Sequence, residues 1–212
     1  MAEKEITLLL ATKNRGKVRE FETIFAGLSS NPENVALPHL RLLTLADIGY
    51  DAEIEENGTS FEENARIKAR AAAALGFVGV ADDSGLCVNA LGGAPGILSA
   101  RYSGGGDEEN NKKLLRELSE APDRSAYYYC AIACAFPDGR GEFTVSGQCR
   151  GIILRDYRGT GGFGYDPLFF SEDLGKSFGE AAPDEKAAVS HRGKAVRAFA
   201  REFYERLRNT NG

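Results

Sequence analysis

The N-terminal part of the chain constrains the fold most, because it places an apolar run, a polar loop and a helical pattern in direct succession. The run from Ile6 to Ala11 is short and apolar, which is typical of a buried strand. After a polar loop, apolar side chains recur at helical spacing, at Val18, Phe21, Ile24, Phe25 and Leu28. This part is therefore predicted to fold as strand, loop and helix.

Short apolar runs and helical patterns continue along the rest of the chain. Strands are predicted at 40–45, 52–55, 77–81, 126–136, 142–150 and 151–154, and helices at 60–76, at 107–118 and after Ser190. Ser60 and Glu63 form a capping-box pattern that opens the second helix. Residues 82–85 are predicted to form a tight turn, which would leave Asp82 and Asp83 at the end of a strand.

Length, composition and charge exclude several classes of protein. The 212 residues fit one compact domain better than two, and 42% hydrophobic with 27% charged residues excludes a disordered or fibrous chain. A net charge of −5 disfavours nucleic acid and anionic membranes as partners. The longest apolar run, 126–136, is too short for a membrane helix, and the N-terminus lacks a signal-peptide pattern. We therefore expect a cytoplasmic protein.

The cysteines and histidines do not form a recognisable zinc-binding pattern. The four cysteines contain no C-x-x-C pair, and His39 and His191 are the only histidines. We expect reduced thiols with a structural role.

The loop at 12–17 is the first candidate site, because it lies between a buried strand and a helix N-terminus, where backbone N–H groups favour an anion. It adds three cations, Lys13, Arg15 and Lys17. It is not a P-loop, since Ala11 and Val18 replace the first glycine and the Ser/Thr of that motif. The alternative is an ordinary helix cap by Thr12 or Asn14, with solvated charges.

An acidic set is the second candidate site and consists of Glu55, Glu56, Asp82 and Asp83. Adjacent carboxylates repel, and Mg²⁺ would neutralise them. Only one of each pair should face the site, because neighbouring residues on extended chain point opposite ways. The alternative for 82–85 is a turn in which aspartate binds its own backbone. Asn64 and Lys68 share one face of the predicted helix and could equally be solvated.

The third candidate combines a glycine-rich loop with the start of the last helix. Phe163 and Tyr165 lie in or beside the glycine-rich segment 159–164, which suits stacking on a base, although structural glycine loops are common. Further donors are offered by Lys186, His191 and Arg192. His191 could equally be a capping or surface residue. Arg192 is expected to reach outward and donate to the 6-oxo group of a base.

Together, these segments resemble the inosine/xanthosine triphosphate pyrophosphatases, the Ham1-like nucleoside triphosphate pyrophosphatase family. The matching segments are 11–17, 59–65 with 68–69, 81–86, 91–96, 99–104, 159–167, 185–186 and 190–193. They cover nearly the whole chain in the family's order, whereas 28–43 aligns with nothing specific. The resemblance implies a homodimeric α/β protein. It further implies a single two-lobed domain over 1–212, with a long curved mixed β-sheet dividing the lobes, helices packed around it and the active-site cleft between them.

The resemblance also implies individual roles. Asp83 would be the general base and a metal ligand, and Glu55 the second metal ligand, with Glu56 as the alternative. Substrate binding is implied for Thr12, Lys13, Asn14, Arg15, Gly16, Lys17, Asn64, Lys68, Ser84, Phe163, Gly164, Tyr165, Asp166, Lys186, His191 and Arg192.

The implied activity is Mg²⁺-dependent hydrolysis of the purine nucleoside triphosphates ITP, dITP and XTP to the monophosphate and pyrophosphate, which would remove deaminated purines from the nucleotide pool. Lys13, Lys17 and the metal would neutralise the polyphosphate, while Asp83 deprotonates or orients the attacking water. One alternative is a pyrophosphatase for other modified nucleotides. Another is a non-catalytic nucleotide sensor, although the joint presence of Asp83, Glu55 and Lys17 argues against it.

Overall fold

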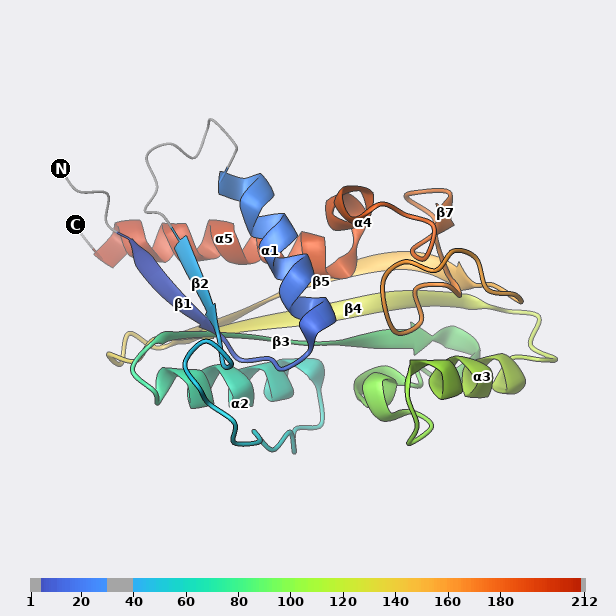
Figure 1. Ribbon diagram of the computed structural model, residues 1–212, viewed down its shortest axis with the longest axis horizontal. Helices are drawn as coiled ribbons and strands as arrows, with labels where there is room; N and C mark the ends of the chain where they lie inside the picture. The colour runs from blue at the N-terminus through green and yellow to red at the C-terminus, as the bar shows by residue number, and fades with distance from the viewer. Residues whose placement is uncertain (1–4, 30–39, 211–212) are drawn as a thin grey trace. The chain divides into compact units, whose positions relative to one another are not determined.

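The computed structural model describes residues 5–29 and 40–210, which form an α/β fold (Figure 1). Its seven-stranded sheet has the order β2-β1-β3-β4-β5-β6-β7. The strands are β1 (Ile6–Leu10), β2 (Leu40–Thr44), β3 (Val78–Val88), β4 (Ser125–Ala135), β5 (Glu142–Ile153), β6 (Phe169–Ser171) and β7 (Lys176–Ser177). β1 pairs in parallel with β2 and β3, whereas β6 pairs antiparallel with β5 and β7. The predicted α/β class with a mixed sheet is confirmed, and the cleft between lobes stays a prediction.

Five α-helices and two short 3₁₀ helices accompany the strands within the described residues. They are α1 (Arg15–Ser29), α2 (Phe61–Ala73), η2 (Asn89–Leu91), η3 (Gly96–Arg101), α3 (Asp107–Glu117), α4 (Pro183–Val189) and α5 (His191–Thr210). Over the same residues, the structure contains no helix with the length and apolar character needed to span a membrane.

The chain divides into two compact units. Among the described residues, the first unit comprises 5–29, 40–83, 131–146 and 195–210, and the second comprises 84–130 and 147–194. β3 leaves the first unit at Asp83 and enters the second at Ser84.

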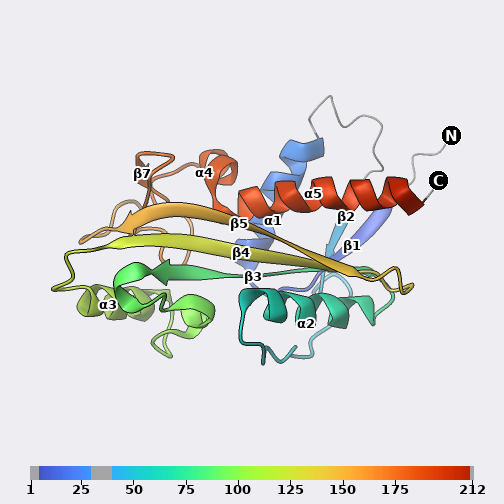
Figure 2. The same ribbon diagram turned by 180° about the vertical axis from the view of Figure 1, so that it is seen from behind.

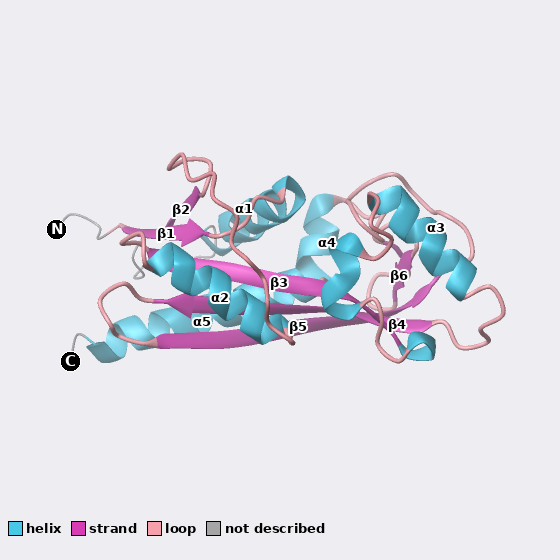
Figure 3. Ribbon diagram, turned by 90° about the horizontal axis from the view of Figure 1, so that it is seen from below, coloured by secondary structure: helices cyan, strands magenta, loops and turns pink. Residues whose placement is uncertain are grey.

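In the first unit, α2 lies on one side of the strands and α1 with α5 on the other (Figures 1 and 2). Seen from the α2 side, this helix runs along the strands (Figure 3). A side chain at Gly79 would place its Cβ 2.1 Å from the backbone oxygen of Ala69 on α2, so only glycine allows this close packing. On the side of the strands away from α2, Phe143 of β5 stacks on Phe199 of α5, with 5.9 Å between ring centroids.

The core of the second unit is a cluster of buried apolar side chains. Its members include Leu86 and Val88 of β3, Leu114 of α3, Tyr128 of β4 and Phe169 of β6. Cys149 and Ile153 of β5 belong to it as well, so the cluster packs the helix α3 against four strands of this unit.

Several predicted elements are confirmed. The helices predicted near the N-terminus, at 60–76, at 107–118 and after Ser190 are present. Ser60 caps α2 by accepting from the backbone N of Glu63 at 3.2 Å. The carboxylate of Glu63 accepts from the backbone N of Thr59 at 2.6 Å and from the backbone of Ser60 as well, as the capping-box pattern predicts. All four cysteines are buried thiols, as predicted.

Other predictions are wrong. Residues 82–85 form no turn, because β3 continues unbroken from 78 to 88, with the aspartates buried beside lysines of the flanking helices. No separate strand exists at 151–154, since β5 runs on to residue 153 and Gly151 lets β6 approach its backbone closely. Residues 52–55 form no strand and are mostly exposed, so they have no apolar face to bury. The sequence analysis also missed α4.

Candidate active site

The predicted site residues form two groups, one in each unit, which are linked through the Asp83–Ser84 peptide bond. The first group contains Thr12, Lys13, Asn14, Arg15, Gly16, Lys17, Glu55, Asn64, Lys68 and Asp83. The second contains Ser84, Phe163, Gly164, Tyr165, Asp166, Lys186, His191 and Arg192.

The two aspartates of β3 face different helices. Asp82 lies fully buried, 3.1 Å from the Nζ of Lys17 on α1, whereas the carboxylate of Asp83 lies 3.5 Å from the Nζ of Lys68 on α2. This arrangement follows from the strand, in which successive side chains point to opposite faces. The expectation that these neighbouring side chains point opposite ways is confirmed, whereas it stays a prediction that only one of them faces the site.

Asp83 is held by an amide and an ammonium group. The Nδ2 of Asn64 donates to Asp83 Oδ2 at 3.1 Å, and the Oδ1 of Asn64 accepts from the backbone N of Gly58 at 2.9 Å. Lys68 bridges Asp83 to Glu56, whose Oε2 lies 3.0 Å from Nζ. A Cβ at Gly58 would lie 2.7 Å from Asn64 Oδ1, so glycine keeps this loop against the amide. The amide of Asn64 and the ammonium of Lys68 therefore connect the segment that contains Glu56 and Gly58 to Asp83.

The surroundings of Asp83 change its basicity. Burial raises the pKa of Asp83, and although Lys68 and Lys17 oppose this, the pKa stays above its usual value. Burial alone would lower the pKa of Lys68, but Asp83, Asp82 and Glu56 outweigh it, so this pKa is raised. Asp83 is thus a carboxylate of increased basicity beside a lysine that stays charged, which suits a general base.

A divalent cation would find hard oxygen donors beside Asp83. Among the described residues, no three or more His, Cys, Asp or Glu side chains are grouped to hold a metal ion. Mg²⁺ commonly takes only one or two protein carboxylates and completes its shell with water and substrate phosphates. The ammonium of Lys68 lies between the carboxylates of Asp83 and Glu56, whereas the side chain of Glu55 is exposed. Of the two glutamates, Glu56 is therefore the one that lies beside Lys68. The donor set fits Mg²⁺.

The loop at 12–17 combines a helix cap with open space. Asn14 Oδ1 accepts from the backbone N of Gly16 at 2.9 Å and of Lys17 at 3.1 Å, so Asn14 caps α1. The Nζ of Lys13 donates to the backbone oxygen of Asp51 at 2.7 Å. A hollow of about 460 Å³ adjoins this loop and is lined by Thr12, Lys13, Arg15, Val18, Arg19, Thr44, Ala46, Tyr50 and Asp51.

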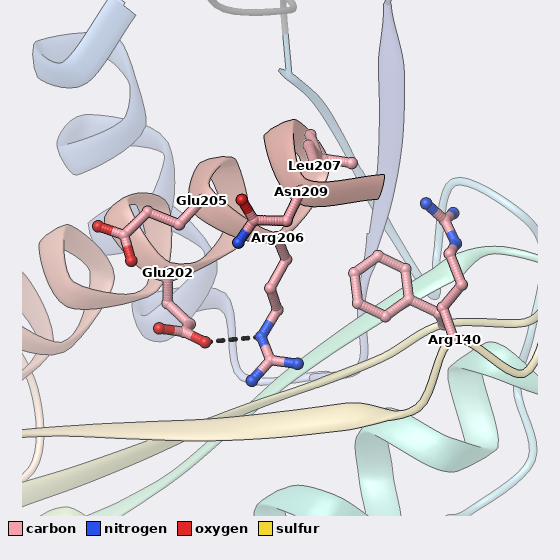
Figure 4. Close-up of a pocket in the computed structure, with 7 residues that line it drawn as sticks. Arg140, Glu202, Glu205, Arg206, Leu207 and Asn209 are labelled. Carbon is pink, nitrogen blue, oxygen red and sulfur yellow. Dashed lines mark hydrogen bonds and ion pairs between the residues drawn. The ribbon is translucent and has the colours of Figure 1, made fainter. Parts of the chain in front are cut away.

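A second hollow of about 440 Å³ in the first unit contains none of the predicted site residues. It lies between the end of α5 and residues Phe136 and Arg140, which adjoin the turn from β4 to β5 (Figure 4). Two of its charged side chains are paired, since Arg206 lies 2.6 Å from Glu202 and Arg140 lies 2.6 Å from Asp138. It lacks the features of a catalytic site.

In the second unit, the glycine-rich loop presents one ring and buries the other. Tyr165 is 3% exposed and its hydroxyl donates to the backbone oxygen of Ser99 at 2.8 Å, so its ring belongs to the core. The half-buried Phe163 is therefore the ring available for stacking. Asp166 Oδ2 accepts from the backbone N of Phe163 at 2.8 Å and from Lys186 Nζ at 2.6 Å, which fixes the loop from within.

The cations of the second group gather around Phe163. The Nζ of Lys186 lies 5.0 Å and the Cζ of Arg192 lies 6.0 Å from the centroid of its ring. Arg192 is only 1% exposed and donates to Ser84 Oγ at 2.6 Å, so the expected outward direction is wrong. The ring of His191 stacks on Tyr128, with 4.5 Å between centroids. The ring of Phe163 thus lies beside the nitrogen donors of Lys186 and Arg192.

Sequence reasoning missed two residues of α3 that contact this loop. Asp107 and Asn111 bond the backbone of Gly164, although they lie more than 50 residues from it in the sequence. Their spacing of four residues on a helix was the only available signal, and it names no partner.

Comparisons with known proteins identify the family of this chain. The sequence profile of the Ham1 family matches residues 8–202. A dITP/XTP pyrophosphatase of Geobacter sulfurreducens is 48% identical over 194 residues, which covers 89% of this chain and 92% of the relative. One from Bacillus cereus is 44% identical over 204 residues, 93% of this chain and 95% of the relative. The solved structure of a HAM1 protein from Coxiella burnetii matches with a TM-score of 0.79 and 34% identity, over 94% of this chain and 99% of that one. The chain belongs to the Ham1 family.

Proposed function

We propose that this protein hydrolyses the deaminated purine nucleoside triphosphates ITP, dITP and XTP to the monophosphate and pyrophosphate. The observation that carries the proposal is the pair of adjacent aspartates on β3, each beside its own lysine, in a chain of the Ham1 family. Relatives that match over about nine-tenths of the chain are named dITP/XTP pyrophosphatases, which supports this substrate class.

Asp83 acts as the general base in this proposal. Its carboxylate would accept a proton from the attacking water, and burial gives it a raised pKa that suits this task. Asn64 donates a hydrogen bond to the ionised carboxylate of Asp83 and Lys68 forms an ion pair with it, and together they fix the orientation of this carboxylate. Lys17, positioned by Asp82, would present a point charge to the polyphosphate.

We propose Mg²⁺ as the cofactor, held by Asp83 together with Glu55 or Glu56. The bound ion would neutralise charge on the phosphates and so lower the cost of bringing water to them. Lys13 and Arg15, which line the hollow beside the loop at 12–17, would add further positive charge for the phosphates.

Base recognition falls to the second group. The guanidinium of Arg192 lies near the face of the Phe163 ring. An N–H of this group would donate a hydrogen bond to the 6-oxo oxygen of hypoxanthine or xanthine. Adenine presents an amino donor there, which would leave the site's donor without an acceptor. Guanine shares the 6-oxo group, so its exclusion needs a further contact.

The direct experiment is product analysis with a panel of triphosphates, with and without Mg²⁺. We expect ITP, dITP and XTP to give monophosphate and pyrophosphate, ATP and GTP to react much more slowly, and chelation to stop turnover. Release of single phosphates would contradict the proposal. Binding without turnover would instead favour the nucleotide sensor. A preference for other modified bases would favour the other pyrophosphatase.

The homodimer and the cytoplasmic location stay predictions. Sedimentation of the purified protein tests the first, and fractionation of cells tests the second.

A further inference from the structure

We infer that Asp107 and Asn111 of α3 are positioning residues that set the affinity for the nucleoside by fixing the backbone of Gly164. We call the two side chains the Gly164 clamp. The inference rests on the proposed function in one respect, since it takes the loop around Phe163 to be the surface that meets the base. Neither residue belongs to the charged machinery around Asp83.

The clamp holds both polar groups of one residue's backbone. The backbone N of Gly164 donates to Asp107 Oδ2 at 2.7 Å, and the Nδ2 of Asn111 donates to the backbone oxygen of Gly164 at 2.9 Å. The two side chains are one helical turn apart and share one face of α3. A single rigid element therefore controls the orientation of Gly164.

The burial and bonding of the Asn111 side chain indicate that its amide N–H is the group that serves the clamp. The side chain is 3% exposed, and its Oδ1 is buried with no hydrogen-bond partner among the described residues. A buried acceptor without a partner costs free energy, which an apolar side chain at this position would avoid. Only the amide nitrogen can donate to a carbonyl, so the contact with Gly164 is the feature that an asparagine supplies here.

The glycine itself needs such support. Gly164 has a φ of +62°, in the left-handed region, and it follows other glycines that give this loop a permissive backbone. The side chains after it are anchored separately, by the bond from Tyr165 to Ser99 and the pair of Asp166 with Lys186. Asp107 holds the N–H of the peptide that joins Phe163 to Gly164, and Asn111 holds the carbonyl of the next peptide, which joins Gly164 to Tyr165. The clamp thus fixes the backbone directly after the residue that carries the ring of Phe163. Its loss should therefore spread the orientations of that ring while the loop stays attached.

The test uses Asn111→Leu, which keeps the approximate size but removes the donor, and Asp107→Ala. Glu108→Ala is the matched control, because Glu108 is also an acidic residue in the first turn of α3 but pairs with Lys112 rather than with the loop. We expect Asn111→Leu to raise the KM for ITP about 10-fold, with kcat within about twofold. Asp107→Ala should act in the same direction but less, because its carboxylate is exposed to water.

Inorganic tripolyphosphate serves as a probe that lacks a nucleoside. Its inhibition constant should stay unchanged in both clamp variants, since the clamp does not touch phosphate-binding residues. An equal rise in the KM for ITP and in this inhibition constant would overturn the inference, and so would an unchanged KM in Asn111→Leu.

Hydrogen exchange of the 159–167 segment, measured without nucleotide, gives an independent readout. Exchange should be faster in Asp107→Ala and Asn111→Leu than in the wild type and in Glu108→Ala; unchanged exchange in both clamp variants would overturn the inference. If Asn111→Leu fails to fold, the exposed Asp107 still provides the test. If the wild type does not hydrolyse ITP, the proposed function fails, while the exchange result still decides whether the clamp exists.

Discussion

The two groups of site residues are built from different interactions. Around β3 in the first unit, carboxylates face ammonium groups, with Asp82 beside Lys17 and Asp83 beside Lys68. Around Phe163 in the second unit, backbone hydrogen bonds and ring contacts dominate, and Asp166 with Lys186 is the buried ion pair. The first arrangement controls charge and proton affinity, and the second controls shape and donor placement. We therefore expect substitutions in the first group to change turnover for every nucleotide, and those in the second to change selectivity.

The largest effect should come from Asp83→Asn. Removing a general base costs about 100-fold to 10,000-fold in turnover, while the near-identical shape should preserve the fold. Steady-state rates with ITP measure the loss, and Asp138→Asn, an exposed aspartate of the first unit that pairs with Arg140, is the control. Near-normal turnover would remove Asp83 from its role.

Lys17→Met should be the next largest, here in stability. The substitution removes the cation 3.1 Å from a fully buried carboxylate, and breaking such a pair costs about 3 kcal/mol. Denaturant unfolding measures the change. The double variant Lys17→Met/Asp82→Asn should recover most of the loss, because the buried charge is gone as well. A loss that is the same in the single and double variants would show that the pair does not couple.

Arg192→Met should have a smaller effect, which falls mainly on the oxo-purine nucleotides. The side chain keeps much of its volume but loses its donors, and a buried base contact of this kind is worth about 1 to 3 kcal/mol. We expect kcat/KM for ITP to fall by about 5-fold to 150-fold and that for ATP to fall much less. Arg201→Met, on the exposed face of α5, controls for a lost arginine. Equal losses for both nucleotides would make Arg192 a phosphate-binding or structural residue.

The smallest effect should be a change in pH dependence in Lys68→Met. Lys68 lowers the pKa of Asp83 against the raising effect of burial, so its removal should raise that pKa further. A general base works when deprotonated, so the acid limb of kcat/KM for ITP should move to higher pH. Rates across a pH series at fixed Mg²⁺ measure it, with Lys194→Met as control, because the half-buried Lys194 pairs with Asp173 and not with Asp83. A shift to lower pH would contradict the assigned electrostatics.

The sequence predicted the parts of the first group that depend on local spacing. Asn64 and Lys68 lie four residues apart on a helix, so their shared face followed from periodicity, and both meet Asp83. Local chemistry misled at 82–85, where Asp-Asp-Ser-Gly favours a turn, because the partners that allow the aspartates to be buried within a strand come from distant helices.

The second group was harder to predict because burial decides it. Tyr165 and Arg192 both carry polar tips that sequence reasoning expects near solvent, yet both are buried by residues far along the chain. The contact of Asn111 with Gly164 spans 53 residues and has no local signature. Family resemblance named the loop, but only packing shows which of its rings remains available.

The ratio of kcat/KM for ITP to that for ATP, determined side by side for the wild type, Asp83→Asn and Arg192→Met, tests the division between the two groups most directly. The account predicts that Asp83→Asn slows both nucleotides in the same proportion and leaves the ratio unchanged, whereas Arg192→Met lowers the ratio while turnover of bound nucleotide persists. A ratio that collapses in Asp83→Asn, or that survives intact in Arg192→Met, would contradict it.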